Sequence, residues 1–372
     1  MGKLHPIMLC LREIALFQFK NHSERRFDFS HPVIGICGLN GVGKTTLLDA
    51  IHYLSFTKSY FTRLDAQAVQ KGQQGFRLEG KMELNGQEET VTCILRETGK
   101  KEIQINGSAH EKLSRHIGRY PLVIIAPDDA SLITEDSRER RNYVDQLLSQ
   151  LDPSYLQSLI IYNKILQQRN SLLKELSEQR SNDYSLLEVL DEQLITPGNL
   201  IHLQRKELLQ SLVPKILSIY QEIAQRGGSP TDEVPSLQYQ SHLLTSSFDS
   251  LLRNNRTKDI YAQRTTQGIH RDEIEMLLNG QPFRMIASQG QRKSLLFALK
   301  LGEMETLTLQ KGFPPLLLLD DVFEKLDEQR INNLLRKVCA DPRAQVFITD
   351  TNAERLRQQL EMIGISFQLI AL

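Results

Sequence analysis

The residues with the clearest chemistry form a glycine-rich segment near the amino terminus. Residues 38–45, GLNGVGKT, match the pattern G-x-x-x-x-G-K-[ST] and stand between a strand-like run, VIGIC, and a segment of helical periodicity, TTLLDAIHYLSF. A phosphate-binding loop requires this strand–loop–helix context. Its glycines let backbone N–H groups close around phosphates, its lysine adds positive charge, and its threonine hydroxyl ligates Mg²⁺. The residues expected to hold a nucleotide are Gly38, Leu39, Asn40, Gly41, Val42, Gly43, Lys44, Thr45 and Thr46.

An acidic strand end supplies the second set of chemical groups. In residues 314–330, PPLLLLDDVFEKLDEQR, four leucines precede two aspartates. Buried parallel strands have this pattern, and ligands bind at their carboxyl ends. We expect Asp320 to hold Mg²⁺ through water, opposite Thr45, and Asp321 to polarise the attacking water. The alternative is that Asp321 caps the next helix and Glu324 is the base.

A polar turn before a helix is the third chemical feature. Ser288, Gln289, Gly290 and Gln291 stand directly before an apolar helical run. Such a turn presents backbone N–H groups at a helix N-terminus, where an anion binds well. Arg292-Lys293 follows in the first turn, where cations oppose the helix dipole, so a bound anion or an acidic partner would stabilise it.

Alternating strands are expected to position these groups in the first 135 residues and again in residues 265–372. Asn85-Gly86 and Asn106-Gly107 predict hairpin turns in the first region, and Asn279-Gly280 predicts one in the second. These two regions are expected to form the two parts of one nucleotide-binding lobe.

A helical lobe is expected between them, at residues 136–264, because the apolar spacing there follows the helical period. Pro197-Gly198 is expected to end one helix and Pro214 to kink or break the next. Residues 229–240 are expected to form a polar connector and residues 243–264 another helix. These helices are predicted to be too short and too often interrupted for a long coiled coil.

Composition narrows the classes of protein. The chain has 372 residues, of which 40% are hydrophobic and 24% charged, and its net charge is zero because 45 basic residues balance 45 acidic ones. A protein that coats nucleic acid with its whole surface is usually basic, so any contact with nucleic acid is expected to use a local patch. The scattered cysteines argue against a zinc site and a disulfide framework, and with no leader pattern we expect a cytoplasmic protein outside the membrane. They are Cys10, Cys37, Cys93 and Cys339.

The order of the three chemical segments resembles that of ABC-type ATPases. Their signature is usually Ser-Gly-Gly-Gln, and here Gln289 replaces the first glycine. In that class the signature turn contacts the γ-phosphate that a second subunit holds. The long separation of the phosphate loop from the acidic strand also fits a nucleotide domain that an insertion splits. The resemblance implies an α/β fold: an ABC-type P-loop ATPase domain, a mixed sheet with flanking helices, split by an inserted helical lobe.

The chain resembles one family nearly end to end, the RecF family of bacterial DNA repair ATPases, which are related to SMC proteins. Several segments in register make this more specific than any single motif. They are LFQFKNHSERRFDF (16–29), FTKSYFTR (56–63), APDDASLI (126–133), RERRNYVD (138–145), GIHRDEIEMLLNGQPF (268–283), SQGQRKSLLFALKLGE (288–303) and LLLLDDVFEKLDEQR (316–330).

The resemblance implies an ATP- and Mg²⁺-dependent homodimer that binds duplex DNA next to single-strand gaps. Such proteins act with RecR and RecO to load recombinase; RecR is the expected direct partner, and direct contact with RecO is left open. Lys44, Asp321 and, from the second subunit, Ser288 are the expected catalytic residues. Asp327 matches the aspartate that lies across the dimer from the other subunit's nucleotide. Related ATPases often have glutamate at Asp321, and the shorter side chain predicts slow hydrolysis that serves as a conformational switch.

Two departures from other ABC-type ATPases leave roles open. Asp350 stands where transporters often have a switch histidine. Asp128 and Asp129 stand where a glutamine usually senses the γ-phosphate. Both departures suit a slow switch better than a fast motor.

Basic residues are the candidates for contacting DNA phosphates, although most charge runs are only solvated faces. These candidates are Lys58, Arg63, Arg138, Arg140, Arg141, Arg253, Arg256, Lys258 and Arg264. Tyr60 and Phe61 are candidates for stacking on bases or for a place in the core. His270-Arg271-Asp272-Glu273 lacks a second cluster at metal-ligand spacing, which favours a structural or dimer-coupling role over a metal site.

Two other functions share part of this pattern. The ATPase subunit of an ABC transporter has the same three segments, but it predicts the switch histidine and sensor glutamine that this chain lacks. A P-loop kinase of a small metabolite would leave the Ser-Gln-Gly-Gln turn without a role.

Overall fold

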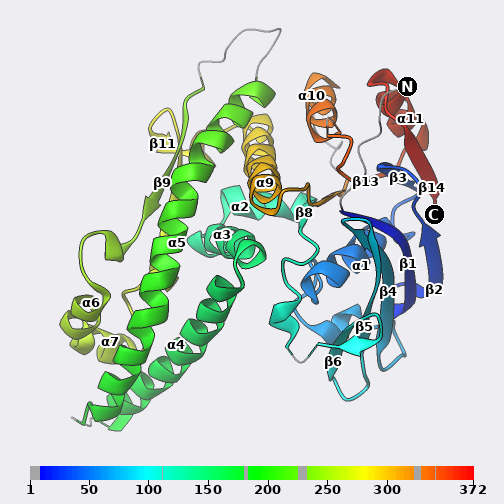
Figure 1. Cartoon of the computed structure of the whole chain (residues 1–372). Coiled ribbons are helices and arrows are strands. Elements are labelled where there is room, and N and C mark those ends of the chain that lie inside the picture. The colour runs from blue at the N-terminus through cyan, green and yellow to red at the C-terminus, as the bar shows by residue number, and fades with distance from the viewer. Residues whose placement is uncertain (1–8, 111, 180–182, 225–232, 322–327, 340) are drawn as a thin grey trace. The chain divides into compact units, whose positions relative to one another are not determined.

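The computed structural model describes residues 9–110, 112–179, 183–224, 233–321, 328–339 and 341–372. They form two compact units, and Figure 1 labels many of their helices and strands. The first unit comprises Met1–Ala130, Ser218–Thr231 and Gln289–Leu372, and the second comprises Ser131–Leu217 and Asp232–Ser288. Residues 265–288, expected in the ATPase lobe, thus pack with the helical region.

An antiparallel sheet forms one layer of the first unit. Its strand order is β2-β1-β4-β5-β6-β7. Both expected hairpin turns are present, since Asn85 and Asn106 have positive φ angles of 52° and 51° and a glycine follows each. The strands are β1 (Leu9–Phe19), β2 (His22–Asp28), β4 (Phe76–Leu84), β5 (Gln87–Leu95), β6 (Lys101–Ile105) and β7 (Ser108–Ala109).

A parallel sheet of strand order β14-β3-β13-β12-β8 carries the chemical segments. Every neighbouring pair in it is parallel. The phosphate loop, the two aspartates and residues 128–129 therefore all follow strands at the same edge, where ligands of such sheets bind. The strands are β3 (Val33–Cys37), β8 (Leu122–Ile125), β12 (Leu316–Leu319), β13 (Val346–Asp350) and β14 (Phe367–Ala371).

Helix α1 (Lys44–Phe56) contacts strands of both sheets. Of its residues only Thr45 is not buried, which explains why the helix is apolar around most of its circumference. The strands of the first unit are thus divided between two sheets with α1 against both. Of the described helices, α9 (Gln289–Lys311), α10 (Glu328–Val338) and α11 (Ala353–Met362) also belong to this unit, as does the end of the long helix α5 (Ser185–Ala224) from Ser218 onward.

The second unit combines helices with a small antiparallel sheet of order β11-β10-β9. Its strands are β9 (Pro235–Gln240), β10 (Glu273–Leu278) and β11 (Gln281–Pro282). Its helices are α2 (Ser131–Thr134), α3 (Ser137–Leu151), α4 (Pro153–Gln179), α6 (Phe248–Asn254), α7 (Arg256–Ala262) and α8 (Phe283–Ile286), together with most of α5 (Ser185–Ala224). None of the described helices is long and apolar enough to cross a membrane.

Helix α5 corrects the expected helix ends. It runs unbroken for 40 residues, with Pro197 and Pro214 inside it. Gly198 does not end the helix; a Cβ there would come 2.4 Å from a ring carbon of Phe248, so the glycine permits close packing. Buried residues along α5 hold it together where the prolines remove hydrogen bonds. The expectation of short helices is therefore wrong.

Two smaller expectations also fail in the second unit. The polar connector contains strand β9, because Pro235–Gln240 pairs with β10 over its whole length. The single helix expected at 243–264 is two helices, α6 and α7, which meet at Asn255. Strand β9 is stabilised by its pairing with β10, which the local sequence does not reveal.

Candidate nucleotide-binding site

The phosphate loop has a backbone that its glycines make possible. Gly41 and Gly43 have φ angles of 83° and 110°, in the left-handed region that other residues rarely adopt. At Gly43 a Cβ would also lie 2.5 Å from His22 Nε2. The loop leads directly into α1, whose free N–H groups and dipole favour an anion.

Lys44 lies over the loop from which it extends. Its Nζ donates to the carbonyl oxygens of Gly38, at 2.8 Å, and Leu39, at 3.1 Å. Only 4% of the residue is exposed. A cation held by two neutral carbonyls in a half-enclosed loop would bind a phosphate strongly.

Thr45 and Asp320 meet although they are far apart in the sequence. Thr45 Oγ1 donates to the carboxylate of Asp320, with distances of 2.9 Å to Oδ2 and 3.2 Å to Oδ1. Thr349 Oγ1 donates to Oδ1 at 2.8 Å and so fixes the carboxylate from the other side. Burial raises the pKa of Asp320, against these hydrogen bonds. A hydroxyl beside a buried carboxylate is a donor set that suits Mg²⁺, which prefers oxygen ligands.

Asp321 follows with a strained backbone. Its φ is 44°, and its N–H donates to Thr349 Oγ1 at 2.8 Å. Asparagine and aspartate tolerate this left-handed conformation better than most residues, which lets the chain reverse direction directly after β12. The alternative base, Glu324, and the expected trans residue, Asp327, lie outside the described residues.

A cavity of about 250 Å³ joins these groups in the first unit. Polar residues and glycines line it: Lys20, Asn21, Asn40, Gly41, Gly43, Lys44, Thr45, Thr46 and Asp321. Lys20 and Asn21 were not predicted as site residues, although they lie in the segment LFQFKNHSERRFDF. Asn21 Nδ2 donates to Gly41 O at 3.4 Å, and Lys20 forms an ion pair with Asp49 at 2.6 Å. The feature of the sequence that could have indicated them is a Lys-Asn pair directly after a strand-like segment.

The signature turn has the expected helix start. Helix α9 begins at Gln289, so exposed Ser288 directly precedes it. Neither Gln289, Gly290 nor Gln291 is among the described residues that line the cavity.

Asp350 does not present a free carboxylate in place of a switch histidine. It is buried, and Arg355 binds both its oxygens, at 3.0 Å from Nε to Oδ2 and 2.5 Å from the terminal nitrogen to Oδ1. Its backbone oxygen accepts a hydrogen bond from Gly38 N at 3.3 Å. The residue thus joins the start of the phosphate loop to the start of α11.

Asp128 and Asp129 differ in surroundings. Asp128 is exposed, whereas Asp129 is 8% exposed and takes part in a buried polar cluster. Asp129 Oδ1 accepts a hydrogen bond from Tyr60 and lies 3.7 Å from Lys300 Nζ. Tyr60 packs edge-on against His52 of α1, and both Tyr60 and Phe61 are partly buried against the hydrophobic core.

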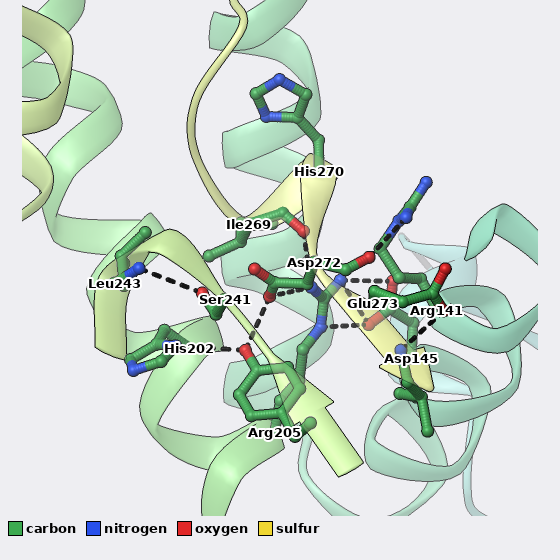
Figure 2. Close-up of polar contacts among 12 residues, drawn as sticks. Arg141, Asp145, His202, Arg205, Ser241, Leu243, Ile269, His270, Asp272 and Glu273 are labelled. Carbon is green, nitrogen blue, oxygen red and sulfur yellow. Dashed lines mark hydrogen bonds and ion pairs between the residues drawn. The ribbon is translucent and has the colours of Figure 1, made fainter. Parts of the chain in front are cut away.

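Side chains of the segment His270-Arg271-Asp272-Glu273 are bonded to neighbours within the second unit, and Figure 2 shows several of these polar contacts. Buried Arg205 pairs with Asp272, at 2.9 Å, and with Asp145, at 2.8 Å. His270 uses both ring nitrogens, one toward Tyr162 and one toward the Thr265 carbonyl, and burial lowers its pKa to about 4. Among the described residues there is no group of three His, Cys, Asp or Glu side chains arranged to hold a metal.

The basic candidates separate into paired and exposed residues. Arg140 is buried against Glu273 at 2.8 Å, and Arg141 donates to the Asp272 carbonyl at 2.6 Å. Two more pair with acidic side chains: Arg253 with Asp249, at 2.9 Å, and Arg256 with Glu188, at 3.0 Å. Arg253 is exposed although it is paired, and the other exposed candidates are Lys58, Arg63, Arg138, Lys258 and Arg264.

Comparison with known proteins gives one consistent result. A family model described as the RecF/RecN/SMC N terminal domain matches residues 10–370. The DNA replication and repair protein RecF of Flavobacterium johnsoniae is 40% identical over 345 residues, which are 93% of this chain and 95% of that protein. RecF of Parabacteroides distasonis is 40% identical over 361 residues, 97% and 96% of the two chains.

Solved structures agree with the sequence matches. A structure described as the recombination mediator protein RecF-ATP in the RecFOR pathway is similar with a TM-score of 0.85 and 30% identity, covering 95% of this chain and 94% of that chain. A Smc head domain from Pyrococcus furiosus is similar with a TM-score of 0.54 and 14% identity, covering 95% and 92%. The second likeness concerns the fold alone. Together the matches confirm the expected α/β fold of an ABC-type ATPase.

Proposed function

The chain belongs to the RecF family of DNA replication and repair proteins, within the ABC-type ATPases, and we propose that two copies join around ATP while bound to DNA. In this proposal each ATP is held by the phosphate loop of one copy and the signature turn of the other. Joining the copies would close a clamp on DNA, and hydrolysis would open it.

The observation that carries the proposal is the composition of the nucleotide cavity. Lys44 and Thr45 lie in it beside Asp321, with Asp320 bonded to Thr45, yet residues 289–291 are absent from the described lining. The Ser288 turn nevertheless has the anion-binding start of a long helix. A second copy would supply that turn to the open side of the phosphates.

The residues present fit ATP and Mg²⁺. The left-handed loop glycines leave room for phosphates, and Lys44 would exchange its two carbonyl partners for phosphate oxygens. Thr45 Oγ1 would ligate Mg²⁺ directly, and Asp320 would hold it through water. When bound, the cation neutralises charge that develops on the transferred phosphoryl group.

We assign the base to Asp321. It lines the cavity, and its side chain would orient water against the γ-phosphate while Ser288 of the second copy binds that phosphate from the opposite side. A shorter side chain than glutamate would hold this water less closely, so hydrolysis would be slow. Asp327 would contact the nucleotide of the partner copy.

DNA would be held through phosphates by exposed cations. Arg140, Arg253 and Arg256 are weaker candidates for contacting DNA phosphates, because each already forms an ion pair with a carboxylate. Exposed Arg138 and Arg264 in the second unit, and Arg63 in the first, are better candidates. Phosphate contacts of this kind give binding that weakens as salt rises.

The partners follow from the relatives. A similar structure is described as a recombination mediator in the RecFOR pathway. We propose that this chain acts in the cytoplasm with RecR, and with RecO as a further partner, at duplex DNA next to single-strand gaps, where recombinase is loaded.

The direct experiment measures binding to duplex, single-strand and gapped oligonucleotides with ATP, ADP and no nucleotide, at stated salt. We expect the tightest binding to duplex-containing DNA with ATP. The matched variants are Arg138→Ala and Arg253→Ala, of which the first removes an exposed cation and the second one already paired. Equal binding in all three nucleotide conditions would contradict the ATP-dependent clamp.

A further inference from the structure

A buried polar chain leads from the nucleotide cavity to helix α9 within the first unit. Its first link is the cavity-lining residue Lys20, whose Nζ lies 2.6 Å from Asp49 Oδ2 on α1. Asp49 is fully buried, and its Oδ1 accepts the backbone N–H of Tyr60 at 2.7 Å. Ser59 Oγ also donates to Asp49, at 2.7 Å, so the segment after α1 is tied to the helix at two points.

The remaining polar contacts of this series join Tyr60 to α9. The Tyr60 hydroxyl donates to Asp129 Oδ1, and the N–H of Ala126 donates to Oδ2 at 2.8 Å. Lys300 of α9 lies 3.7 Å from the same Oδ1, with its Nζ 5.8 Å from the centre of the Tyr60 ring. Asp129 and Lys300 are 8% and 6% exposed, so their attraction is weakly screened by solvent.

A buried lysine is expensive unless charged partners surround it. Burial alone would lower the pKa of Lys300, but Asp129, then Tyr60 and Glu303, raise it above the ordinary value. Lys300 therefore keeps its charge inside the protein and holds α9 to residues that follow β8 and α1. The same helix begins with the signature residues, and Lys300 lies at its middle.

We propose that Lys300 is a positioning residue, which transmits occupation of the nucleotide cavity through Asp49, Tyr60 and Asp129 to the start of α9. A phosphate in the cavity would draw Lys20 from Asp49, and the change at Asp49 would reach Tyr60 through its N–H. Because Tyr60 and Lys300 share Asp129, a shift of one changes the bonding of the other. Asp129 thus acquires a role at the position where related ATPases have a sensor glutamine, without touching the phosphate. This inference rests on the proposed function in one respect: the proposed function makes the start of α9 the part that contacts ATP held by a second copy.

The test uses hydrogen exchange of residues 289–296 in the full chain, at concentrations where it is monomeric, with and without ATP. We expect ATP to slow exchange there in the wild type. In Lys300→Met and Asp129→Asn the ATP-induced change should fall about tenfold, with ATP affinity measured separately and nearly unchanged. The double variant should be no worse than the worse single one, because both remove the same link.

The matched control is Lys311→Met, which removes another lysine of α9, one that donates to the Gly118 carbonyl at 2.9 Å. It should keep the full ATP response. If Lys300→Met does not fold, Tyr60→Phe is used instead, because removing the hydroxyl eliminates the hydrogen bond to Asp129 and so interrupts the series of polar contacts. An unchanged ATP response in the variants, multiplied effects in the double variant, or no response in the wild type would overturn the inference.

Dimer formation is measured separately by light scattering. If ATP slows hydrogen exchange at the start of α9 in the wild type but the protein stays monomeric at all concentrations, the proposed function is contradicted and the coupling is not. If the wild type and Lys300→Met dimerise at the same ATP concentration and show the same change in hydrogen exchange at α9, only the coupling is contradicted.

Discussion

Thr45 Oγ1 lies 2.9 Å from Oδ2 of Asp320, which joins the start of α1 to the end of β12 across the parallel sheet. Thr349 adds a second hydroxyl to the same carboxylate at 2.8 Å. These contacts hold a buried acidic group in one orientation beside the phosphate loop. We therefore expect Asp320 to be the carboxylate that holds the cation.

Replacing Asp320 by Asn should separate cation use from nucleotide binding. The amide keeps an oxygen for Thr45 but removes the charge that would hold Mg²⁺. We expect ATP hydrolysis to fall by about 100-fold or more, whereas ATP binding without Mg²⁺ stays close to wild type. Thr45→Ser keeps the hydroxyl and is the control, with near-normal hydrolysis. Wild-type turnover in Asp320→Asn would show that the carboxylate does not hold the cation.

Asp321 can be tested by lengthening it. Asp321→Glu restores one methylene and should raise the hydrolysis rate several-fold, whereas Asp321→Asn should abolish hydrolysis and leave an ATP-stabilised dimer. Single-turnover hydrolysis and light scattering measure the two effects. If Glu324→Gln abolishes hydrolysis and Asp321→Asn does not, then Glu324 is the base.

Glu303 gives the fold a pH dependence of known sign. Burial raises its pKa from 4.5 to about 7, and Oε2 is buried without a hydrogen-bond partner among the described residues. Since the folded pKa is above the unfolded one, the stabilising contribution is complete below pH 4.5 and is lost as the pH rises to about 7. The size of the pKa shift limits the contribution of Glu303 to the free energy of unfolding to about 3 kcal/mol.

The measurement compares urea unfolding of the wild type and Glu303→Gln between pH 4.5 and 8. Relative to the variant, the wild type should lose stability across this interval and then stay level. Glu305→Gln, on the same helix with a partly exposed side chain, is the matched control variant. A constant difference between wild type and Glu303→Gln at every pH would refute the assignment.

Arg205 should be among the most sensitive positions of the second unit. It is 3% exposed and pairs with both Asp145 and Asp272 (Figure 2). Arg205→Met would leave two carboxylates without their cation and should lower the free energy of unfolding by about 3–5 kcal/mol. Arg253→Ala, which breaks an exposed pair with Asp249, should cost less than about 1 kcal/mol. Denaturant unfolding would decide, and a loss at Arg205 no larger than at Arg253 would contradict the network's importance.

The sequence predicted the parts of the fold whose signals are local. Asn85-Gly86 fixes a hairpin because both residues adopt positive φ angles, and the leucines before Asp320 form a buried parallel strand. Helix α5 was misjudged because Pro197 and Pro214 are strong local breakers, whereas burial along the helix outweighs them. Strand β9 was missed because its partner, β10, lies some distance along the chain.

The site divides in the same way. The phosphate-loop residues and Asp320 follow from spacing, and the structure brings Lys44, Thr45 and Asp320 together. The role of Asp129 could not be read from the sequence, because its partners Tyr60 and Lys300 come from separate segments. The occupied carboxylate of Asp350 likewise depends on Arg355 one helical turn later.

A first test of the shared site is Ser288→Arg. The bulky cation should block the contact between copies, so the variant should bind ATP through Lys44 yet remain monomeric by light scattering. Lys44→Ala should instead weaken ATP binding itself, by about tenfold or more. Dimerisation of Ser288→Arg at wild-type ATP concentrations would contradict the shared site.

The most direct measurement mixes these two variants. Each alone should hydrolyse ATP very slowly, but a mixed dimer contains one complete site, with Lys44 from the Ser288→Arg copy and Ser288 from the Lys44→Ala copy. Steady-state ATP hydrolysis, with duplex DNA present, is followed as the ratio of the two variants is changed at constant total protein. The account predicts that activity rises to a maximum near equal amounts. Activity equal to the weighted sum of the separate variants at every ratio would contradict a site built from two chains.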